Sequence, residues 1–273
     1  MQKIKTSTLL RYLVILVIAL FVLVGIIGII GKTSIGMFVW TYTKIAPLAT
    51  LVSPKDAVLR FEIGNYYFGG GAYDIEKAEK YYLEALKIDP ALHGPHYQLA
   101  RIYFVQGRFY LAMQEINKEI EMYPEFKRSY YVRGLIYGYS GRLEEAADDF
   151  KEFLKWKPDS WAGKNDLAWI YFQQGKYTET GDAARAGLKV APDNPWLLNA
   201  LGVSLLNTGD KKGAKEAFIK ALEIVATMSP KDWGRAYPGN DPSIYREGLT
   251  KMKESIEENL KLLGDDGAIK SGT

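Results

Sequence analysis

Hydrophobic residues follow two patterns along the chain, one continuous and one periodic. Residues 12–31, YLVILVIALFVLVGIIGIIG, form an uncharged run of 20 residues. A helix of that length rises roughly 30 Å, which matches the hydrocarbon thickness of a bilayer. The run therefore predicts a transmembrane helix, and residues 1–31 form a basic amino-terminal segment that ends with it. A cleaved signal peptide is the competing interpretation, but its apolar core is shorter, roughly 7–15 residues.

Basic side chains are denser before this run than after it. Lys3, Lys5 and Arg11 precede it, whereas Lys32 and Lys44 are the basic residues between its end and residue 53. The positive-inside rule therefore favours a single-pass protein with a cytoplasmic amino terminus and an extracytoplasmic body.

Residues 32–55 are predicted to be a juxtamembrane linker. Trp40 and Tyr42 in this segment suit the interfacial layer of a membrane. A second span over residues 33–53 is the alternative, and it would return the body to the cytoplasm. Lys44 argues against that span, because a charged side chain is costly at the centre of a bilayer.

Beyond the linker, proline and glycine recur at a constant interval of 34 residues. The repeated positions are Pro90, Pro124, Pro158 and Pro192, and Gly107, Gly141, Gly175 and Gly209. A fixed period of this length indicates stacked helical hairpins, each of which buries its apolar face against its neighbours.

One repeat shows how such a hairpin forms. Apolar residues recur with helical spacing over residues 127–140 and again over 143–156. Gly141 separates the two segments and can adopt the left-handed conformation that ends a helix. Gly134 and Ala146 are small, so the two predicted helices can cross closely.

This pattern resembles the tetratricopeptide repeat. In one unit the motif residues are Leu99, Ala100, Tyr103, Gly107, Ala112, Ile116 and Pro124. The resemblance covers five tandem units over residues 56–226 and implies an all-α solenoid of about five helical hairpins. In the fourth unit Thr180, Ala184 and Gly187 replace the usual residues of the second helix, which predicts looser packing there.

The period stops after residue 226, and residues 227–264 are predicted to be a linker followed by a capping helix. Asp241 and Pro242 suit a helix start, because proline is tolerated in the first turn. An apolar stripe follows on Ile244, Leu249, Met252, Ile256, Leu260 and Leu263. Such a helix can cover the exposed face of the last repeat. Residues 265–273 are predicted to be a disordered tail.

Composition narrows the possible functions. The chain contains no cysteine and two histidines, which excludes disulfides, thiolate metal sites and a cysteine nucleophile. Residues 1–55 carry a charge of +6, whereas the remainder carries 29 basic and 32 acidic residues, a charge of −3. A basic amino-terminal segment on a mildly acidic body favours contact with membrane lipid through the amino-terminal helix and argues against nucleic-acid binding.

No constellation of side chains typical of catalysis is present, so we expect neither enzymatic activity, nor a cofactor, nor a metal site. His93 and His96 are spaced to share a helix face, and we expect both to be exposed. The acidic pairs Glu144-Glu145 and Asp148-Asp149 are expected to lie on a solvated helix face.

The resemblance implies that the first helix of each hairpin lines a concave groove where a partner protein or peptide binds. The groove residues expected from it are Tyr97, Arg101, Phe104, Arg128, Tyr131, Leu135, Tyr139, Asn165, Trp169, Phe172, Trp196, Asn199 and Val203. Aromatic residues and arginine are enriched at interface hot spots, and Asn165 and Asn199 could each bond a peptide backbone. The alternative is that these aromatics pack against neighbouring hairpins or against the carboxy-terminal segment folded into the groove.

One branch of the family binds chaperone tails through a clamp for two carboxylates. Asn65 and Arg128 occupy compatible positions here, but Phe61 and Val132 stand where that clamp needs basic residues. A peptide of mixed polar and aromatic character is therefore the better expectation than a carboxy-terminal aspartate.

Together these patterns predict a membrane-anchored scaffold or adaptor that binds a partner in its concave groove. Proteins of similar layout serve in envelope, secretion or pilus assembly, which is a likeness of architecture alone. A fixed structural subunit of a membrane protein complex is the alternative, and the oligomeric state stays open.

Overall fold

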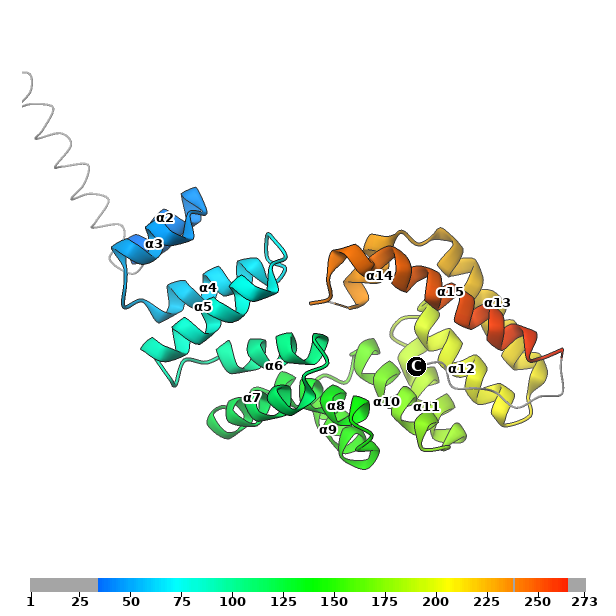
Figure 1. Ribbon diagram of the computed structural model, residues 1–273. Helices are drawn as coiled ribbons and strands as arrows, with labels where there is room; N and C mark the ends of the chain where they lie inside the picture. Colours follow the sequence, from blue (N-terminus) through cyan, green and yellow to red (C-terminus); the bar gives the residue numbers. More distant parts are fainter. Residues whose placement is uncertain (1–33, 238, 265–273) are drawn as a thin grey trace, which may run out of the picture.

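The computed structural model describes residues 34–237 and 239–264, in which the regular elements are helices (Figure 1). The predicted transmembrane helix and the predicted tail at 265–273 lie outside these residues. Within residues 34–237 and 239–264, no helix is long and apolar enough to span a bilayer.

Ten of the helices form five successive hairpins that stack side by side into a curved solenoid (Figure 1). The pairs are α4 (Ala57–Tyr67) with α5 (Ile75–Ile88), α6 (Pro95–Val105) with α7 (Phe109–Met122), α8 (Arg128–Tyr139) with α9 (Leu143–Trp156), α10 (Trp161–Gln173) with α11 (Tyr177–Leu188), and α12 (Pro195–Asn207) with α13 (Lys211–Thr227). The predicted all-α solenoid is confirmed.

Local sequence sets where these helices begin and turn. The four glycines spaced by 34 residues, Gly107, Gly141, Gly175 and Gly209, all have φ between +71° and +91°. This left-handed conformation is costly for residues with a Cβ, which explains why glycine recurs at every turn. Side-chain N-caps begin five of the hairpin helices, from Asp56, Asp74, Ser160, Asn194 and Asp210.

In the first, third and fifth hairpins an aromatic ring of the second helix packs against a glycine of the first helix. A Cβ added to Gly134 would lie 3.1 Å from the ring of Phe150, and one on Gly202 would lie 2.5 Å from Phe218. Both rings are fully buried. The small residues predicted to let the helices cross closely therefore do so, and burial of each ring stabilises its hairpin.

The fourth hairpin is packed closely, so the prediction of a looser second helix is wrong. Thr180 and Ala184 are buried, and a Cβ on Gly187 would lie 2.5 Å from the side chain of Leu197. The Ser204 hydroxyl donates to the carbonyl of Tyr177 at 2.6 Å. Small side chains on α11 bring the next hairpin closer rather than loosening the contact.

Residues 34–53 are not a linker, which corrects the prediction for this segment. They form α2 (Ile35–Thr43) and α3 (Ala46–Val52), which pack against the first hairpin. Trp40 is 4% exposed and meets the ring of Tyr66 edge-on at 5.2 Å. Its indole is thus part of the protein core, because the first hairpin offers it an apolar surface.

The last elements of the described residues are α14 (Pro230–Ala236), a 3-10 turn (Pro242–Ile244) and α15 (Tyr245–Lys261). Asp241 caps the turn at the predicted helix start by accepting from the amide of Ser243. The apolar stripe of α15 faces α13, the last repeat helix, and Ile256 on that stripe is fully buried. Within the predicted linker, α14 lies beside α15.

Candidate functional site

A cavity of about 1110 Å³ occupies the concave side of the solenoid. Its walls come from the first helices of the hairpins, α6, α8, α10 and α12, and α14 and α15 complete them. The structure places all of the groove residues expected from the sequence in this lining, namely Tyr97, Arg101, Phe104, Arg128, Tyr131, Leu135, Tyr139, Asn165, Trp169, Phe172, Trp196, Asn199 and Val203.

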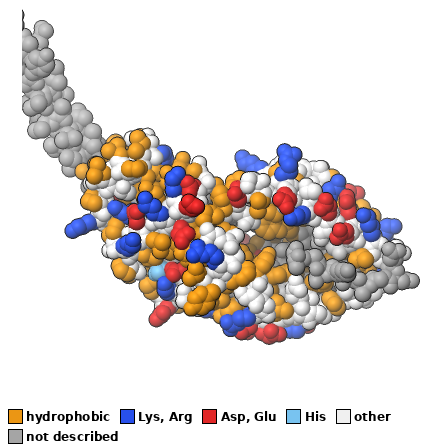
Figure 2. Space-filling model, viewed as in Figure 1, with side chains coloured by type: hydrophobic (Ala, Val, Ile, Leu, Met, Phe, Trp, Pro, Cys, Tyr) orange, Lys and Arg blue, Asp and Glu red, His pale blue; other side chains and the backbone are white. Residues whose placement is uncertain are grey.

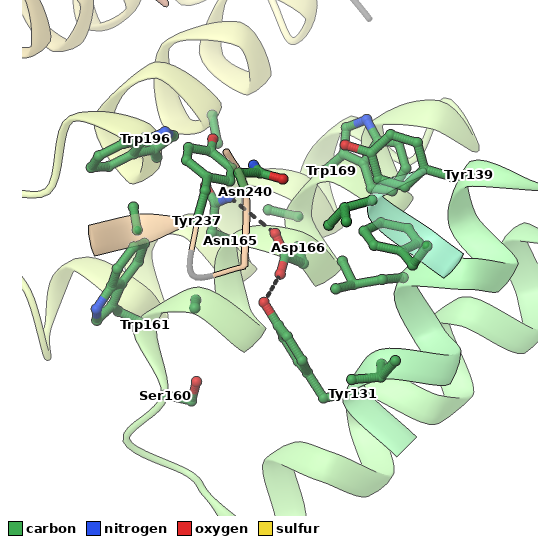
Figure 3. Close-up of a pocket in the computed structure, with 18 of the residues that line it drawn as sticks. Tyr131, Tyr139, Ser160, Trp161, Asn165, Asp166, Trp169, Trp196, Tyr237 and Asn240 are labelled. Atoms are coloured by element: carbon green, nitrogen blue, oxygen red, sulfur yellow. Dashed lines mark hydrogen bonds between the residues drawn. The ribbon is translucent and has the colours of Figure 1, made fainter. Parts of the chain in front are cut away.

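Aromatic rings form two sides of the cavity (Figure 3). On one side Tyr139 contacts Phe104 and Trp169, with ring centroids 5.3 Å and 5.0 Å apart. On the other side Trp161 and Trp196 stack with their centroids 5.8 Å apart. Such rings offer large apolar area at little cost in conformational entropy, so this lining suits apolar side chains of a partner.

Asp166 places a carboxylate among these rings (Figure 3). It accepts hydrogen bonds from the Tyr131 hydroxyl at 2.5 Å and from the Asn165 amide at 3.4 Å. Burial raises the pKa of Asp166 to about 6, and the two hydrogen bonds act in the opposite direction. Burial, followed by the nearby Asp166 charge, raises the pKa of Tyr131 well above its ordinary value.

The other charged residues of the lining are all basic. They are Arg101, Arg128, Lys157, Arg235 and Lys251. The guanidinium of Arg101 lies 4.9 Å from the ring centre of Phe68 and donates to the side chain of Gln98 at 2.7 Å. Acidic side chains outside the lining pair with three of these basic residues, Lys157, Arg235 and Lys251. The lining is therefore aromatic, with more basic than acidic groups.

The two asparagines of the predicted peptide site have different surroundings. Asn165 bonds Asp166 within the cavity, whereas the Asn199 side-chain oxygen accepts from the amide of Asn259 on α15 at 3.2 Å. Asn259 is itself buried. The carboxy-terminal helix thus covers the last repeat's share of the groove.

Residues 237 and 239–241 reach across the concave side to the first hairpin. The ring of Tyr237 lies 5.9 Å from that of Trp196, and the Gly239 carbonyl accepts from the Tyr73 hydroxyl at 3.1 Å. Burial, followed by the charge of Asp241, raises the pKa of Tyr73 to about 12. The carboxy-terminal segment therefore joins the two ends of the solenoid over the cavity. The sequence left open whether this segment folds into the groove, and the structure shows that it covers part of the groove.

Sequence reasoning missed Asp166, Trp161 and Tyr237. Asp166 follows Asn165 directly in α10 and could have been found as a carboxylate beside a predicted groove residue. Tyr237 lies in a segment rich in proline and glycine, and its aromatic side chain was the one feature of the sequence that could have marked it as a cavity residue. Its position over the cavity depends on contacts with α12 that no local pattern predicts.

Two side chains outside the cavity differ from their predicted surroundings. His96 is 9% exposed and contacts the carboxylate of Glu115 at 2.5 Å, so it is not an exposed histidine. Asp149 is also buried, and Arg133 binds both of its oxygens, at 2.7 and 2.8 Å. In the described part of the chain, no group of three or more histidine and carboxylate side chains is placed to hold a metal ion.

Family models for the tetratricopeptide repeat match residues 131–195, 61–92 and 197–224. These ranges fall within the five hairpins of the solenoid. The chain contains tetratricopeptide repeats.

Solved structures support the same fold. MamA from Desulfovibrio magneticus superposes on the repeats with a TM-score of 0.57 at 18% identity, covering 63% of this chain and 97% of that one. YrrB, described as a TPR protein with an unusual peptide-binding site, superposes with a TM-score of 0.55 at 16% identity, covering 66% of this chain and 92% of YrrB. At these identities the likeness shows the fold alone.

Sequence relatives share the repeats over part of their length. Protein FlbA of Caulobacter vibrioides is 27% identical over 190 residues, 67% of this chain and 31% of FlbA. The Hsp70-Hsp90 organising protein of Plasmodium falciparum is 30% identical over 110 residues, 40% of this chain and 43% of that relative. The chain thus spans less than half the length of either relative.

Proposed function

We propose that the chain is a protein-interaction module that binds a partner peptide in the aromatic cavity on the concave side of its repeats. The observation that carries this proposal is the lining of the cavity, with aromatic rings on two sides and five basic residues. The indole nitrogen of Trp196 is buried in this wall without a hydrogen bond of ordinary geometry, and the side chain that interacts with it is Tyr237. An acceptor from a ligand could pair this donor better, which would contribute about 0.5–1.5 kcal/mol.

The charge of the lining favours an acidic partner with large apolar side chains. Five basic residues and one carboxylate line the cavity, and acidic side chains outside the lining pair with three of the five. Carboxylates of a peptide would still meet an excess of basic groups there. The aromatic walls would hold its apolar side chains, and backbone carbonyls could accept from the Trp196 indole. The description of YrrB as having a peptide-binding site and the name of the Plasmodium relative, Hsp70-Hsp90 organising protein, support a peptide or protein as the partner.

The structure does not favour a chaperone-tail clamp of the kind weighed from the sequence. The Asn65 side-chain oxygen already accepts from Tyr82 at 2.9 Å and from Gln98 at 2.9 Å. Val132 is buried, and Phe61 packs into the same core as Tyr82. We therefore propose that the peptide binds along the aromatic walls, without a dedicated pocket for a terminal carboxylate.

The proposal includes membrane anchorage through residues 12–31. Its support is the uncharged run itself and the excess of basic residues before it. On this arrangement the repeats face the extracytoplasmic side, and a role in assembling envelope, secretion or pilus machinery is the setting that the layout suggests.

The test is peptide binding to the full-length protein in lipid nanodiscs. Short fluorescent peptides that combine aspartate or glutamate with leucine and tryptophan should bind more tightly than matched peptides with lysine in place of the acids. Trp196→Phe keeps an aromatic side chain but removes the donor and part of the indole's contact area, so affinity should fall by at least about 2- to 12-fold, the equivalent of one hydrogen bond.

Trp40→Phe is the matched control, because Trp40 is buried on α2 away from the cavity. It should leave peptide affinity unchanged. Equal affinity for acidic and basic peptides, together with no effect of Trp196→Phe at an unchanged melting temperature, would remove the cavity as the binding site.

A further inference from the structure

Large apolar side chains are exposed in one region more than elsewhere in the described chain. Residues 35–58 hold eight of the 17 exposed large hydrophobic residues of the described ranges. They are Ile35, Phe38, Tyr42, Ile45, Leu48, Leu51, Val52 and Val58, with exposures from 39% to 75%. Figure 2 shows hydrophobic side chains gathered at this end of the molecule, over α2 and α3. We name these eight residues the apolar patch.

The patch is held in place by a folded inner face. Trp40, Ala46 and Ala49 are buried against the first hairpin, and the Gly36 amide donates to the Ser53 hydroxyl at 2.9 Å. Since α2 and α3 bury one side, the side chains on the other side are fixed outward. Neither helix contains a charged residue, which is unusual for a surface that meets water.

Distance along the chain indicates what covers the patch. The uncharged run ends at Gly31, and Ser34, the N-cap of α2, follows three residues later. Three extended residues span at most about 11 Å. The interfacial layer of a bilayer is about 5–8 Å deep on each side, so a run that spans the membrane leaves α2 at the lipid surface.

The charges around α2 and α3 also favour a lipid surface as the neighbour of the apolar patch. Residues 1–55 contain no acidic side chain, and Lys32, Lys44 and Lys55 flank the two helices. Lys44 lies 5.1 Å from the ring centre of Trp40, which places a positive charge at the turn between α2 and α3. Basic residues beside exposed apolar and aromatic ones are typical of protein surfaces that rest on anionic lipid.

We propose that the apolar patch docks into the interfacial layer of the bilayer that residues 12–31 cross. The proposal rests on the anchorage included in the proposed function and adds a second contact with lipid. Two contacts fix the tilt of the solenoid, whereas a single flexible tether would let it rotate freely. The repeats then present their cavity at a set height and angle above the membrane.

The chain lacks cysteine, so single cysteines can carry an environment-sensitive fluorophore at chosen sites of the full-length protein. Leu51→Cys reports on the patch, and Tyr110→Cys on α7 is its matched control, since both residues are 75% exposed. Val22→Cys, within the uncharged run, reports on the anchor. Each labelled variant is reconstituted in phosphatidylcholine–phosphatidylglycerol vesicles, with and without lipids that carry a doxyl quencher.

We expect the label at Leu51→Cys to emit at shorter wavelength than the label at Tyr110→Cys and to be quenched by doxyl lipid. A label at residue 51 that behaves like the one at residue 110, while the label at residue 22 is quenched, refutes the docking and leaves the anchorage intact. An unquenched label at residue 22 refutes the anchorage, whatever residue 51 does.

A second copy of the chain is the other possible cover for the patch. In that case the label at residue 51 would emit at shorter wavelength without being quenched by lipid, and Leu51→Cys proteins would cross-link to one another through their thiols. That pair of results would overturn docking to lipid and assign the patch to self-association.

Discussion

The two ends of the solenoid are both extended by helices outside the repeats, but their outer surfaces differ. At the carboxy-terminal end, eight of the 17 residues of α15 are charged. At the amino-terminal end, the 16 residues of α2 and α3 include none. Each addition buries an apolar side against the adjacent hairpin, around Ile256 at one end and Trp40 at the other.

A terminal repeat needs a cover because no further repeat buries its apolar face. The helix α15 provides a cover whose outer side suits water, and an ion pair between Lys253 and Glu257 lies on it. The helices α2 and α3 cover the first hairpin but leave apolar side chains outside. Both terminal hairpins are therefore covered by added helices. The charged outer side of α15 suits water, whereas the apolar outer side of α2 and α3 suits lipid.

Among variants at the two ends of the solenoid, Ile256→Ala is expected to lower the free energy of unfolding the most. Ile256 is fully buried between α15 and the last hairpin, so its truncation leaves a cavity in the core. We expect the free energy of unfolding to fall by about 2–5 kcal/mol, measured by denaturant unfolding followed by circular dichroism. A loss below about 1 kcal/mol would mean that α15 contributes little to the last repeat.

Asp166→Asn tests how well the carboxy-terminal segment shields the cavity from water. The pKa of Asp166 is raised from its ordinary value to about 6, so the ionised form destabilises the folded protein. This penalty is absent below pH 4, grows as the pH rises from 4 to 6, and is complete above the folded pKa. Asparagine can keep the hydrogen bond from Tyr131, so the variant should be more stable than the native chain at pH 8, by up to about 3 kcal/mol.

Melting temperatures at pH 8 and pH 4 check this expectation. The gap between Asp166→Asn and the native chain should close at pH 4, where the carboxyl is protonated in both the folded and unfolded states. The same gap at both pH values would show that Asp166 is not buried as an ionisable group.

A smaller effect is expected where the carboxy-terminal segment reaches the first hairpin. Tyr73→Phe removes the hydrogen bond to the Gly239 carbonyl, one of the contacts that join the two ends. Amide exchange at residues 239–241 should become about 2- to 12-fold faster, the equivalent of one hydrogen bond. Tyr110→Phe, on an exposed ring, is the control and should leave exchange at these amides unchanged.

The smallest effect is expected from Leu51→Ala at the amino-terminal end. Leu51 is 75% exposed on α3, so its truncation removes almost no buried area. In detergent the free energy of unfolding should change by less than about 0.5 kcal/mol. A large loss would place Leu51 in a protein contact that α2, α3 and the first hairpin do not supply, and it would weaken the assignment of this face to lipid.

Much of the fold and the cavity lining follows from the sequence for one geometric reason. Residues that recur every 34 positions take equivalent places in successive hairpins. Gly107 and Gly141 therefore mark the same turn, and Asn165 and Asn199 both face the concave side. Once the residues on the concave side are predicted for one repeat, the equivalent positions of the other repeats follow. For this reason the expected groove residues line one cavity.

Contacts between elements outside the repeats could not be predicted in this way. Asn199 is bonded by Asn259, which lies 60 residues further along the chain. Asp166 acquires its raised pKa from the surrounding walls rather than from its neighbours in sequence. Trp40 suited a membrane interface by its residue type, yet the structure buries it against Tyr66.

The sequence by itself determined the period, the turns and the concave face, because helix propensity, glycine conformation and hydrophobic spacing act over a few residues and repeat. Only the tertiary structure decided what happens at the ends of the array. There the helices have no period to follow, and their positions depend on which apolar surface remains uncovered once the repeats have packed. That packing placed Tyr237 and Gly239 over the cavity, and it buried one side of α2 and α3 while leaving the other exposed.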